Sequence, residues 1–151
     1  SADLYEKLFY NLNTTGAVLS PFDSYQLIRG LKTLSLRMER STANAQEIVA
    51  FLEQSPAVKE VLYTGRGGMI SFKVADEKRI PHILNTLKVF SFAESLGGVE
   101  SLITYPTTQT HADIPAEVRH SYGLTDDLLR LSIGIEDVRD LIEDLRQALE
   151  G

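Results

Sequence analysis

The chain has 151 residues, 43% apolar and 24% charged, which is enough for one ordinary globular domain with a hydrophobic core. Its 15 basic and 21 acidic residues give a net charge of -6 without any basic run, which argues against a nucleic-acid-binding surface because such surfaces cluster Lys and Arg. The absence of cysteine excludes disulfides and thiolate chemistry. No apolar run approaches the roughly 20 residues of a membrane helix, and the N-terminus lacks a secretory layout, so we expect a cytoplasmic protein with no membrane partner.

Three helices are predicted in the first 54 residues of the chain. Leucines spaced four apart favour a short helix over residues 3–12, and Asn13-Thr14-Thr15-Gly16 has the composition of a turn. Ser20-Pro21-Phe22-Asp23 signals a helix start, since it offers a capping hydroxyl, a proline for the first helical position and the acid of a capping box. Gly30 is expected to interrupt this helix, and a longer one should run from about residue 31 to 54.

The middle of the chain changes to a period of two. Residues 58–63 and 69–74 are predicted strands, joined as a hairpin by Gly65-Arg66-Gly67-Gly68. Residues 76–87 are a plausible helix, and 89–93 a third strand.

The last third mixes strands and helices again. Residues 99–103 are a weaker extended candidate, followed by a Thr-rich loop. A short helix over 115–121, a strand over 128–133 and an amphipathic helix over 137–149 complete the chain. This mixture predicts an α+β fold, with an antiparallel sheet of about four strands and helices covering one face.

Few residues suggest chemistry by pattern alone. Gly65-Arg66-Gly67-Gly68 could approach a phosphate, but it lacks the spacing and the following helix of a phosphate loop, so a plain hairpin is favoured. His82, His111 and His120 are not at metal-ligand spacing, so no metal site is predicted. No nucleophile is paired with a base, and no lysine has a special context.

Two positions leave alternatives open. Alternation in the strand over 128–133 places Arg130 on the face opposite the aliphatic side chains, as a solvated residue or as a planar fork for a carboxylate. Ser95-Leu96-Gly97-Gly98 is either a tight hairpin turn or a place where a ligand meets the backbone, with the carboxylate of Glu94 nearby.

Three separated motifs, in the right order, resemble the C-terminal domain of the pyridoxal-phosphate enzymes of cysteine and methionine metabolism. They read LSPFDSYQLIRGLKTLSLRMERSTANA, FAESLGGVESLITYPTTQTH and YGLTDDLLRLSIGIEDVRDLIEDLRQAL. The resemblance covers about residues 7–149, and the AESLGGVESL form looks most like the cystathionine γ-synthases of that family.

The resemblance implies the small domain of a fold-type I enzyme. Its large N-terminal domain would hold pyridoxal phosphate and supply the Schiff-base lysine from a Ser-x-Thr-Lys motif, which this chain lacks. Residues 1–13 would be a linking helix from that domain, and residues 14–151 the substrate-recognition domain. The chain alone would then bind no cofactor and be inactive, and the full-length enzyme would be a homotetramer.

The resemblance also implies roles for five residues. Arg130 matches the arginine that grips the substrate α-carboxylate, and Ser95 matches a residue that contacts the same group. Glu94 matches an acid associated with a distal amino group of the substrate. Thr110 would line the pocket, although Gln109 stands where many relatives have Met, and Asn13 would lie in a loop near the mouth of the active site.

The activity implied is a transferase reaction of methionine biosynthesis, the replacement of the acyl group of an O-acylated homoserine by cysteine. The alternatives are an O-acetylhomoserine sulfhydrylase, a cystathionine γ- or β-lyase, or a free-standing amino-acid-binding or oligomerisation module.

Overall fold

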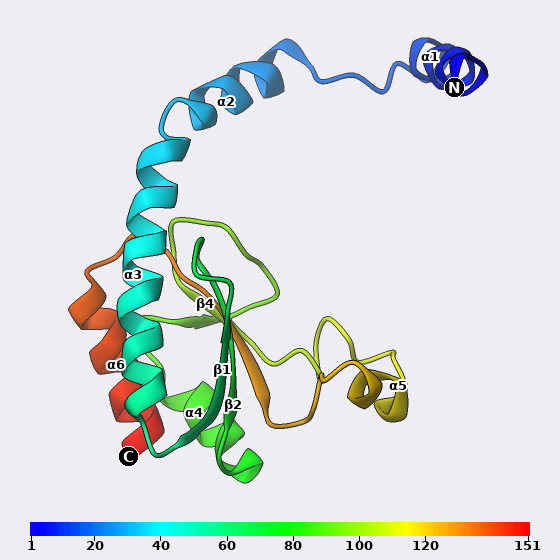
Figure 1. Cartoon of the computed structure of the whole chain (residues 1–151). Coiled ribbons are helices and arrows are strands. Elements are labelled where there is room, and N and C mark those ends of the chain that lie inside the picture. Colours follow the sequence, from blue (N-terminus) through cyan, green and yellow to red (C-terminus); the bar gives the residue numbers. More distant parts are fainter. The chain divides into compact units, whose positions relative to one another are not determined.

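A computed structural model describes all of residues 1–151 (Figure 1). The chain forms two compact units, Ser1–Ser35 and Leu36–Gly151. The first unit is helical, and the second contains the sheet and its core.

The first unit holds helices α1, Ala2–Thr15, and α2, Pro21–Leu31. The predicted turn at Asn13 is wrong, because the helix continues to Thr15, whose hydroxyl donates to the carbonyl of Asn11 at 2.7 Å. Gly16 ends the helix with a φ of 64°, a left-handed conformation that suits glycine. The start of α2 is confirmed: the hydroxyl oxygen of Ser20 accepts the N–H of Asp23 at 3.1 Å.

Gly30 does not interrupt α2, contrary to the prediction. It is helical, and the break comes at Lys32 and Thr33, before helix α3 begins at Leu34 and runs to Gln54. A single glycine lowers helical stability by only about 1 kcal/mol relative to alanine, so the helix can continue through Gly30.

The second unit is built on a five-stranded sheet in the order β1-β2-β5-β4-β3. All neighbouring pairs are antiparallel except β3 with β4. The strands are β1 Val58–Tyr63, β2 Met69–Val74, β3 Ser91–Phe92, β4 Leu102–Thr104 and β5 Leu128–Ser132. The α+β prediction is confirmed, with five strands in a mostly antiparallel sheet.

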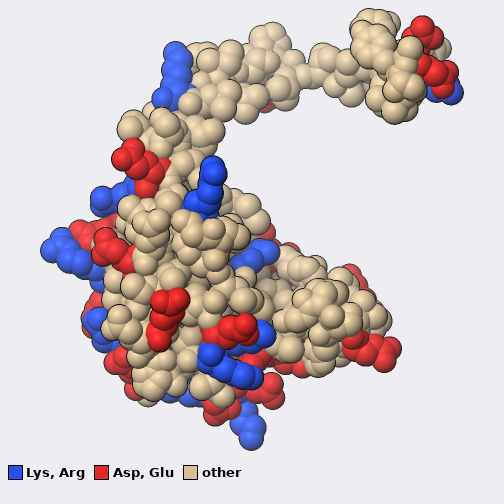
Figure 2. All heavy atoms as spheres, in the orientation of Figure 1, with Lys and Arg blue, Asp and Glu red and all other residues tan.

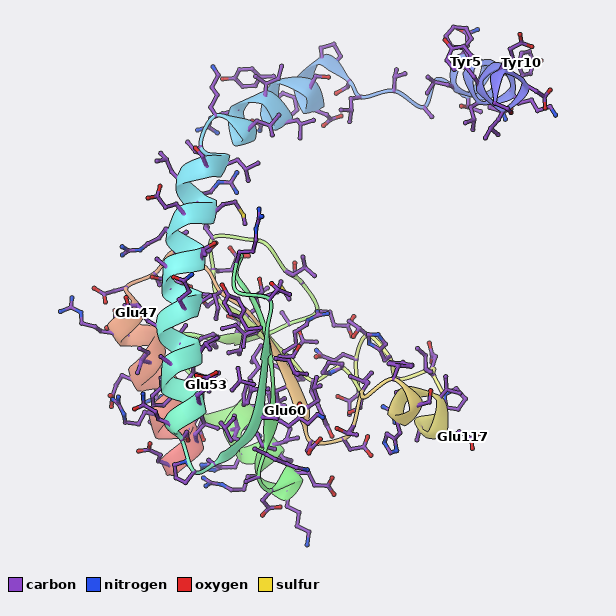
Figure 3. All side chains as sticks on the ribbon, in the orientation of Figure 1. Tyr5, Tyr10, Glu47, Glu53, Glu60 and Glu117 are labelled. Carbon is purple, nitrogen blue, oxygen red and sulfur yellow. The ribbon has the colours of Figure 1, made fainter.

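Helices cover one face of this sheet (Figure 1). They are α3, α4 at Ile80–Thr86 after the 3-10 turn Glu77–Arg79, and α6 at Val138–Glu150. Fully buried aliphatic side chains from these helices pack on the strands, among them Ile48, Leu52, Ile83, Leu141 and Leu145. Figure 3 shows Glu47 and Glu53 on the exposed side of α3, which is the amphipathic division that a helix over a sheet requires.

The segment between β3 and β4 is not a hairpin. Ser91 pairs with Leu102 and Phe92 with Ile103 in parallel, so the chain between them crosses back along the sheet. A two-residue hairpin joins only antiparallel strands. The tight hairpin turn considered for Ser95–Gly98 is therefore excluded.

Strand β3 is shorter than the predicted 89–93. The buried carboxylate of Asp144 in α6 accepts the backbone N–H groups of Lys88, Val89 and Phe90 at 2.8–3.1 Å. Amides held in this way are not available to a neighbouring strand, so the ladder begins only at Ser91.

The remaining helix, α5 at Ala116–Ser121, lies on the other side of the sheet from α3 (Figure 1) and matches its prediction. No helix combines the length and the apolar character needed to cross a bilayer. On the face visible in Figure 2, acidic and basic side chains of the second unit are interspersed, without a continuous basic patch.

Candidate functional site

Arg130 lies in the middle of the sheet face that the helices leave open. In the strand register it is opposite Ser71 of β2 on one side and Thr104 of β4 on the other. Directly opposed residues point to the same face, so the three side chains form a row. Its neighbours in β5, Leu129 and Leu131, are fully buried in the core. The predicted alternation of this strand is confirmed.

The guanidinium of Arg130 has no partner within the chain. The residue is half-buried, and no side chain or carbonyl forms a hydrogen bond or ion pair with it. Lys73, two residues along β2 from Ser71, is different: its ammonium lies 2.7 Å from the carboxylate of Glu60, and this hydrogen bond is the main cause of its raised pKa. Arg130 therefore keeps its planar set of donors available for a carboxylate from outside.

Besides the backbone bond from the N–H of Ala93 to the carbonyl of Ile103 at 3.1 Å, two side-chain hydrogen bonds hold the segment that contains Glu94 and Ser95 on this face. The hydroxyl of Thr104 donates to the carbonyl of Ala93 at 2.9 Å, and the N–H of Gly97 donates to the hydroxyl oxygen of Ser132 at 2.9 Å. Gly97 has a φ of 75°, a conformation that side chains resist, so glycine lets the backbone turn at the second of these bonds.

Glu94 and Ser95 lie between these two hydrogen bonds. Both are exposed, and neither side chain is hydrogen-bonded within the chain. The structure thus brings the segment of Glu94 and Ser95 to the same sheet face as Arg130.

Thr110 belongs to the turn that follows β4. Its hydroxyl lies 2.7 Å from Nδ1 of His111 and is exposed, and no hydrogen bond links it to the row of Arg130. Gln109, the residue that departs from many relatives, accepts the N–H of Tyr105 at 2.9 Å and so closes this turn from within.

Asn13 is not in a loop. It lies exposed in the last turn of α1, in the first unit, whereas the other four predicted site residues belong to the second. The expectation of a loop is wrong for the reason given above, that the helix runs on to Gly16.

Sequence reasoning missed the residues that hold the end of the β3–β4 connection, at Ser101. The carboxylate of Glu136 accepts the N–H of Ser101 at 2.6 Å and its hydroxyl at 2.9 Å, and the hydroxyl oxygen of Ser101 accepts the N–H of Gly134. Asn44 of α3, which is 2% exposed, donates to the carbonyls of Gly134 and Glu136. Asn44 stands among apolar residues on the buried face of its helix, and this position could have predicted the contact, since buried amides need partners.

The lysines of the chain do not fit a site that would hold an aldehyde cofactor. Three of them are paired with the carboxylates of Asp3, Asp127 and Glu60. The other three, Lys32, Lys78 and Lys88, are exposed on the surface. An activated lysine is instead desolvated in a pocket or set beside another cation.

Comparisons with known proteins assign a relationship to almost the whole chain. The family model described as Cys/Met metabolism PLP-dependent enzyme matches residues 1–150. A cystathionine gamma-synthase/O-acetylhomoserine (thiol)-lyase from Bacillus subtilis is 57% identical over 97% of this chain and 39% of that protein. A cystathionine gamma-synthase from Haemophilus influenzae is 55% identical over 97% of this chain, and a cystathionine gamma-lyase from Bacillus subtilis is 49% identical over 99%.

Solved structures agree with these relatives. A cystathionine gamma-lyase from Micromonospora echinospora superimposes with a TM-score of 0.91 at 36% identity, covering all of this chain and 44% of that one. The enzyme of the same name from Lactobacillus plantarum, complexed with L-serine, gives a TM-score of 0.86 at 36% identity. The chain spans about two fifths of the length of the curated relatives it matches.

Proposed function

Because the chain belongs to the family of Cys/Met metabolism PLP-dependent enzymes, we propose that it is the C-terminal, substrate-recognising domain of a cystathionine γ-synthase-like enzyme. The enzyme would join an O-acylated homoserine to cysteine by γ-replacement. Two relatives whose names include cystathionine gamma-synthase are 57% and 55% identical, against 49% for a γ-lyase, and this supports the choice of γ-synthase over lyase.

The observation that carries the proposal is the uncommitted guanidinium of Arg130. A half-buried arginine without a carboxylate partner in its own chain is suited to a carboxylate from a ligand. In the proposed enzyme this ligand is the substrate α-carboxylate. A bidentate contact would orient the amino acid, so that the bond to be broken is aligned with the cofactor.

The exposed segment beside Arg130 supplies the other contacts in this proposal. Ser95 would donate its hydroxyl to the same carboxylate, and the carboxylate of Glu94 would pair with a distal ammonium such as that of cystathionine. Thr110 would line the pocket. Glu94 and Ser95 are free of partners within the chain, as residues that bind a ligand need to be.

The cofactor would be held by the part of the enzyme that this chain does not contain. Two facts support this step: the chain spans about two fifths of its relatives, and its own lysines are ion-paired or exposed. The first unit adds a third, because neither α1 nor α2 has a buried residue and side chains such as Tyr5 and Tyr10 project from α1 (Figure 3). We propose that the cofactor domain covers these helices and that the 151-residue chain alone is inactive.

The test replaces Arg130 by Lys in the full-length enzyme. Lysine keeps the charge but is a point donor that cannot form the two parallel bonds of the guanidinium. A charge-assisted hydrogen bond contributes about 1.5–3 kcal/mol, so we expect kcat/KM for the O-acylated homoserine to fall roughly 10- to 150-fold. Steady-state kinetics with cysteine as the second substrate measure this directly.

The matched control is Arg146→Lys. Arg146 is an exposed arginine of α6 paired with Glu143, and it lies outside the proposed site. Its replacement should leave kcat/KM unchanged. If Arg130→Lys also retained the wild-type value, Arg130 would not bind the substrate and the proposal would lose its main support.

A lyase or sulfhydrylase activity is the alternative within the family, since a relative named for γ-lyase activity is 49% identical and the relative that is 57% identical is also named O-acetylhomoserine (thiol)-lyase. The full-length enzyme can be given O-acylated homoserine with cysteine, O-acylated homoserine with sulfide, or cystathionine alone. The proposal predicts the highest kcat/KM in the first assay, and cleavage of cystathionine as the leading activity would replace γ-synthase by lyase.

A further inference from the structure

We infer that Thr104 and Ser132 are positioning residues, which hold Glu94, Ser95 and Leu96 beside Arg130 through hydrogen bonds to the backbone on either side of this segment. The inference rests on the proposed function, in which Arg130 and this segment bind the substrate together. Neither side chain needs to touch the substrate for this role.

Thr104 supplies the side-chain contact at the beginning of the segment, where the N–H of Ala93 also donates to the carbonyl of Ile103 at 3.1 Å. The hydroxyl of Thr104 donates to the carbonyl of Ala93 at 2.9 Å, and the side chain is 1% exposed. Thr104 is also the residue of β4 that lies opposite Arg130. Opposed residues of antiparallel strands have Cα atoms about 5 Å apart, so the first anchor is as close to Arg130 as a neighbouring strand allows.

Ser132 fixes the end of the segment. Its hydroxyl oxygen accepts the N–H of Gly97 at 2.9 Å, and it is 4% exposed. Ser132 follows Arg130 by two residues in β5, which puts both side chains on one face about 7 Å apart along the strand. The second anchor thus lies beside Arg130 on its own strand.

These two contacts leave three residues between them. Glu94, Ser95 and Leu96 are exposed, and none of their side chains is held by another part of the chain. Their distance from Arg130 therefore depends on Ala93 and Gly97. A displacement of about 1 Å in a binding group can cost about 100-fold in rate, so loss of an anchor should affect activity without removing any contact to the substrate.

The rest of the β3–β4 connection, after Gly97, is held by hydrogen bonds that do not involve Thr104 or Ser132. The N–H of Ile135 donates to the carbonyl of Val99 at 2.9 Å, and Ser101 is bound to Glu136. Loss of the hydroxyl of Thr104 or Ser132 should therefore loosen the segment and leave the remaining fold in place.

The first measurement is amide hydrogen exchange in the 151-residue chain. Ser132→Ala removes the acceptor of the Gly97 N–H, so exchange at Gly97 should accelerate about tenfold or more. The amide of Ile135, whose acceptor is the carbonyl of Val99, should exchange at the wild-type rate. Unchanged exchange at Gly97 would show that Ser132 does not hold the segment, whereas faster exchange at both amides would show a general loss of structure and would equally overturn the inference.

The second measurement is kinetic, in the full-length enzyme. Thr104→Val keeps the shape of the side chain and removes its hydroxyl, whereas Thr104→Ser keeps the hydroxyl. We expect kcat/KM to fall about tenfold or more for Thr104→Val and Ser132→Ala, and Thr104→Ser to stay near the wild type. The control is Ser55→Ala, another buried serine that accepts a backbone N–H, that of Ala57, but that follows α3 and is not on the open sheet face.

The outcomes separate this inference from the proposed function. If Arg130→Lys is impaired while Thr104→Val and Ser132→Ala retain full kcat/KM, the positioning role is wrong and the substrate site stands. If Arg130→Lys is unimpaired, Arg130 does not bind the substrate, and the proposed function loses its main support. If Thr104→Ser is impaired as strongly as Thr104→Val, the hydroxyl of Thr104 is not what matters, and the inference is overturned for that residue.

Discussion

Asp144 of α6 is a buried carboxylate, 4% exposed, that binds the backbone between α4 and β3. Its two oxygens accept three consecutive backbone N–H groups, those of Lys88, Val89 and Phe90, and Oδ1 also accepts the amide of Gln147 at 2.6 Å. A single carboxylate thus satisfies three consecutive amides, of which that of Phe90 is buried and would otherwise lack a partner. It also sets where β3 starts, and so where the chain enters the segment of Glu94.

Asp144→Asn tests this role. The amide has only one acceptor oxygen and turns an NH₂ group toward backbone N–H donors, so two or more hydrogen bonds are lost. We expect the free energy of unfolding to fall by about 2–3 kcal/mol, measured by urea denaturation. Asp140→Asn, an exposed change on the same helix, is the control and should stay within about 0.5 kcal/mol of the wild type. Equal stability of the two variants would contradict the assigned role.

Helix α6 depends on Asp137 at its start. Oδ1 of Asp137 accepts the backbone N–H of Arg139 at 2.9 Å, and the guanidinium of Arg139 donates to both carboxylate oxygens. The side-chain bond from Arg139 is the main cause of a pKa for Asp137 well below its usual value, with smaller contributions from the Arg139 N–H and the charge of Arg40. The helix that begins here contributes Leu141 and Leu145 to the core, so its start affects the whole unit.

The lowered pKa predicts how stability depends on pH. A carboxyl group whose pKa is lower in the folded than in the unfolded state stabilises the fold fully above the unfolded pKa, about 3.9, and loses this contribution as the pH falls toward the folded value. Asp137→Asn keeps a capping oxygen but does not titrate. We expect the Tm of the wild type to approach that of the variant as the pH is lowered from 5 to 2, in thermal unfolding followed by circular dichroism. Two curves that stay parallel over this range would contradict the prediction.

Local patterns predicted most of these elements. The bounds of β2 follow from alternation, the helix start at Ser20 from capping chemistry and the last helix from its amphipathic stripe, because each signal lies in or within a few residues of the element it specifies. Strand β3 was predicted too long because the residue that shortens it, Asp144, lies more than 50 positions away. The parallel pairing of β3 with β4 likewise could not be predicted, because the sequence of neither strand specifies the direction of its partner.

In the candidate site, too, local sequence predicted some features, and others depend on residues far apart in the chain. Alternation placed Arg130 opposite the core, but sequence pattern alone left open whether it is solvated or available for a ligand. That distinction depends on the absence of a partner in space. The anchors at Thr104 and Ser132 could not be predicted, since each joins residues from different strands and loops.

At the scale of the whole molecule, apolar surface is unevenly distributed. Of 24 exposed large hydrophobic side chains, 14 lie within the first 35 residues, including Leu8, Phe9 and Phe22 at 56–68% exposure. In Figure 2 the first unit shows few charged side chains. We expect exposed apolar side chains in this number to be covered by another protein surface. The core of the second unit, by contrast, draws only on residues from Ala45 to Leu149 and their neighbours.

This division predicts that residues 36–151 fold without the first unit. The shortened chain should unfold cooperatively in urea, with a midpoint close to that of the same transition in the 151-residue chain, because no core residue has been removed. It should also bind much less of the apolar dye ANS, which reports exposed hydrophobic surface.

The full-length enzyme completes the comparison, since the proposed cofactor domain would cover α1 and α2. Its dye binding per molecule should be lower than that of the 151-residue chain and closer to that of residues 36–151. Strong dye binding by the full-length enzyme would mean that these helices remain exposed, and would count against a cofactor domain seated on them. A shortened chain without a cooperative transition would show instead that the sheet and its three covering helices are not a self-sufficient folding unit.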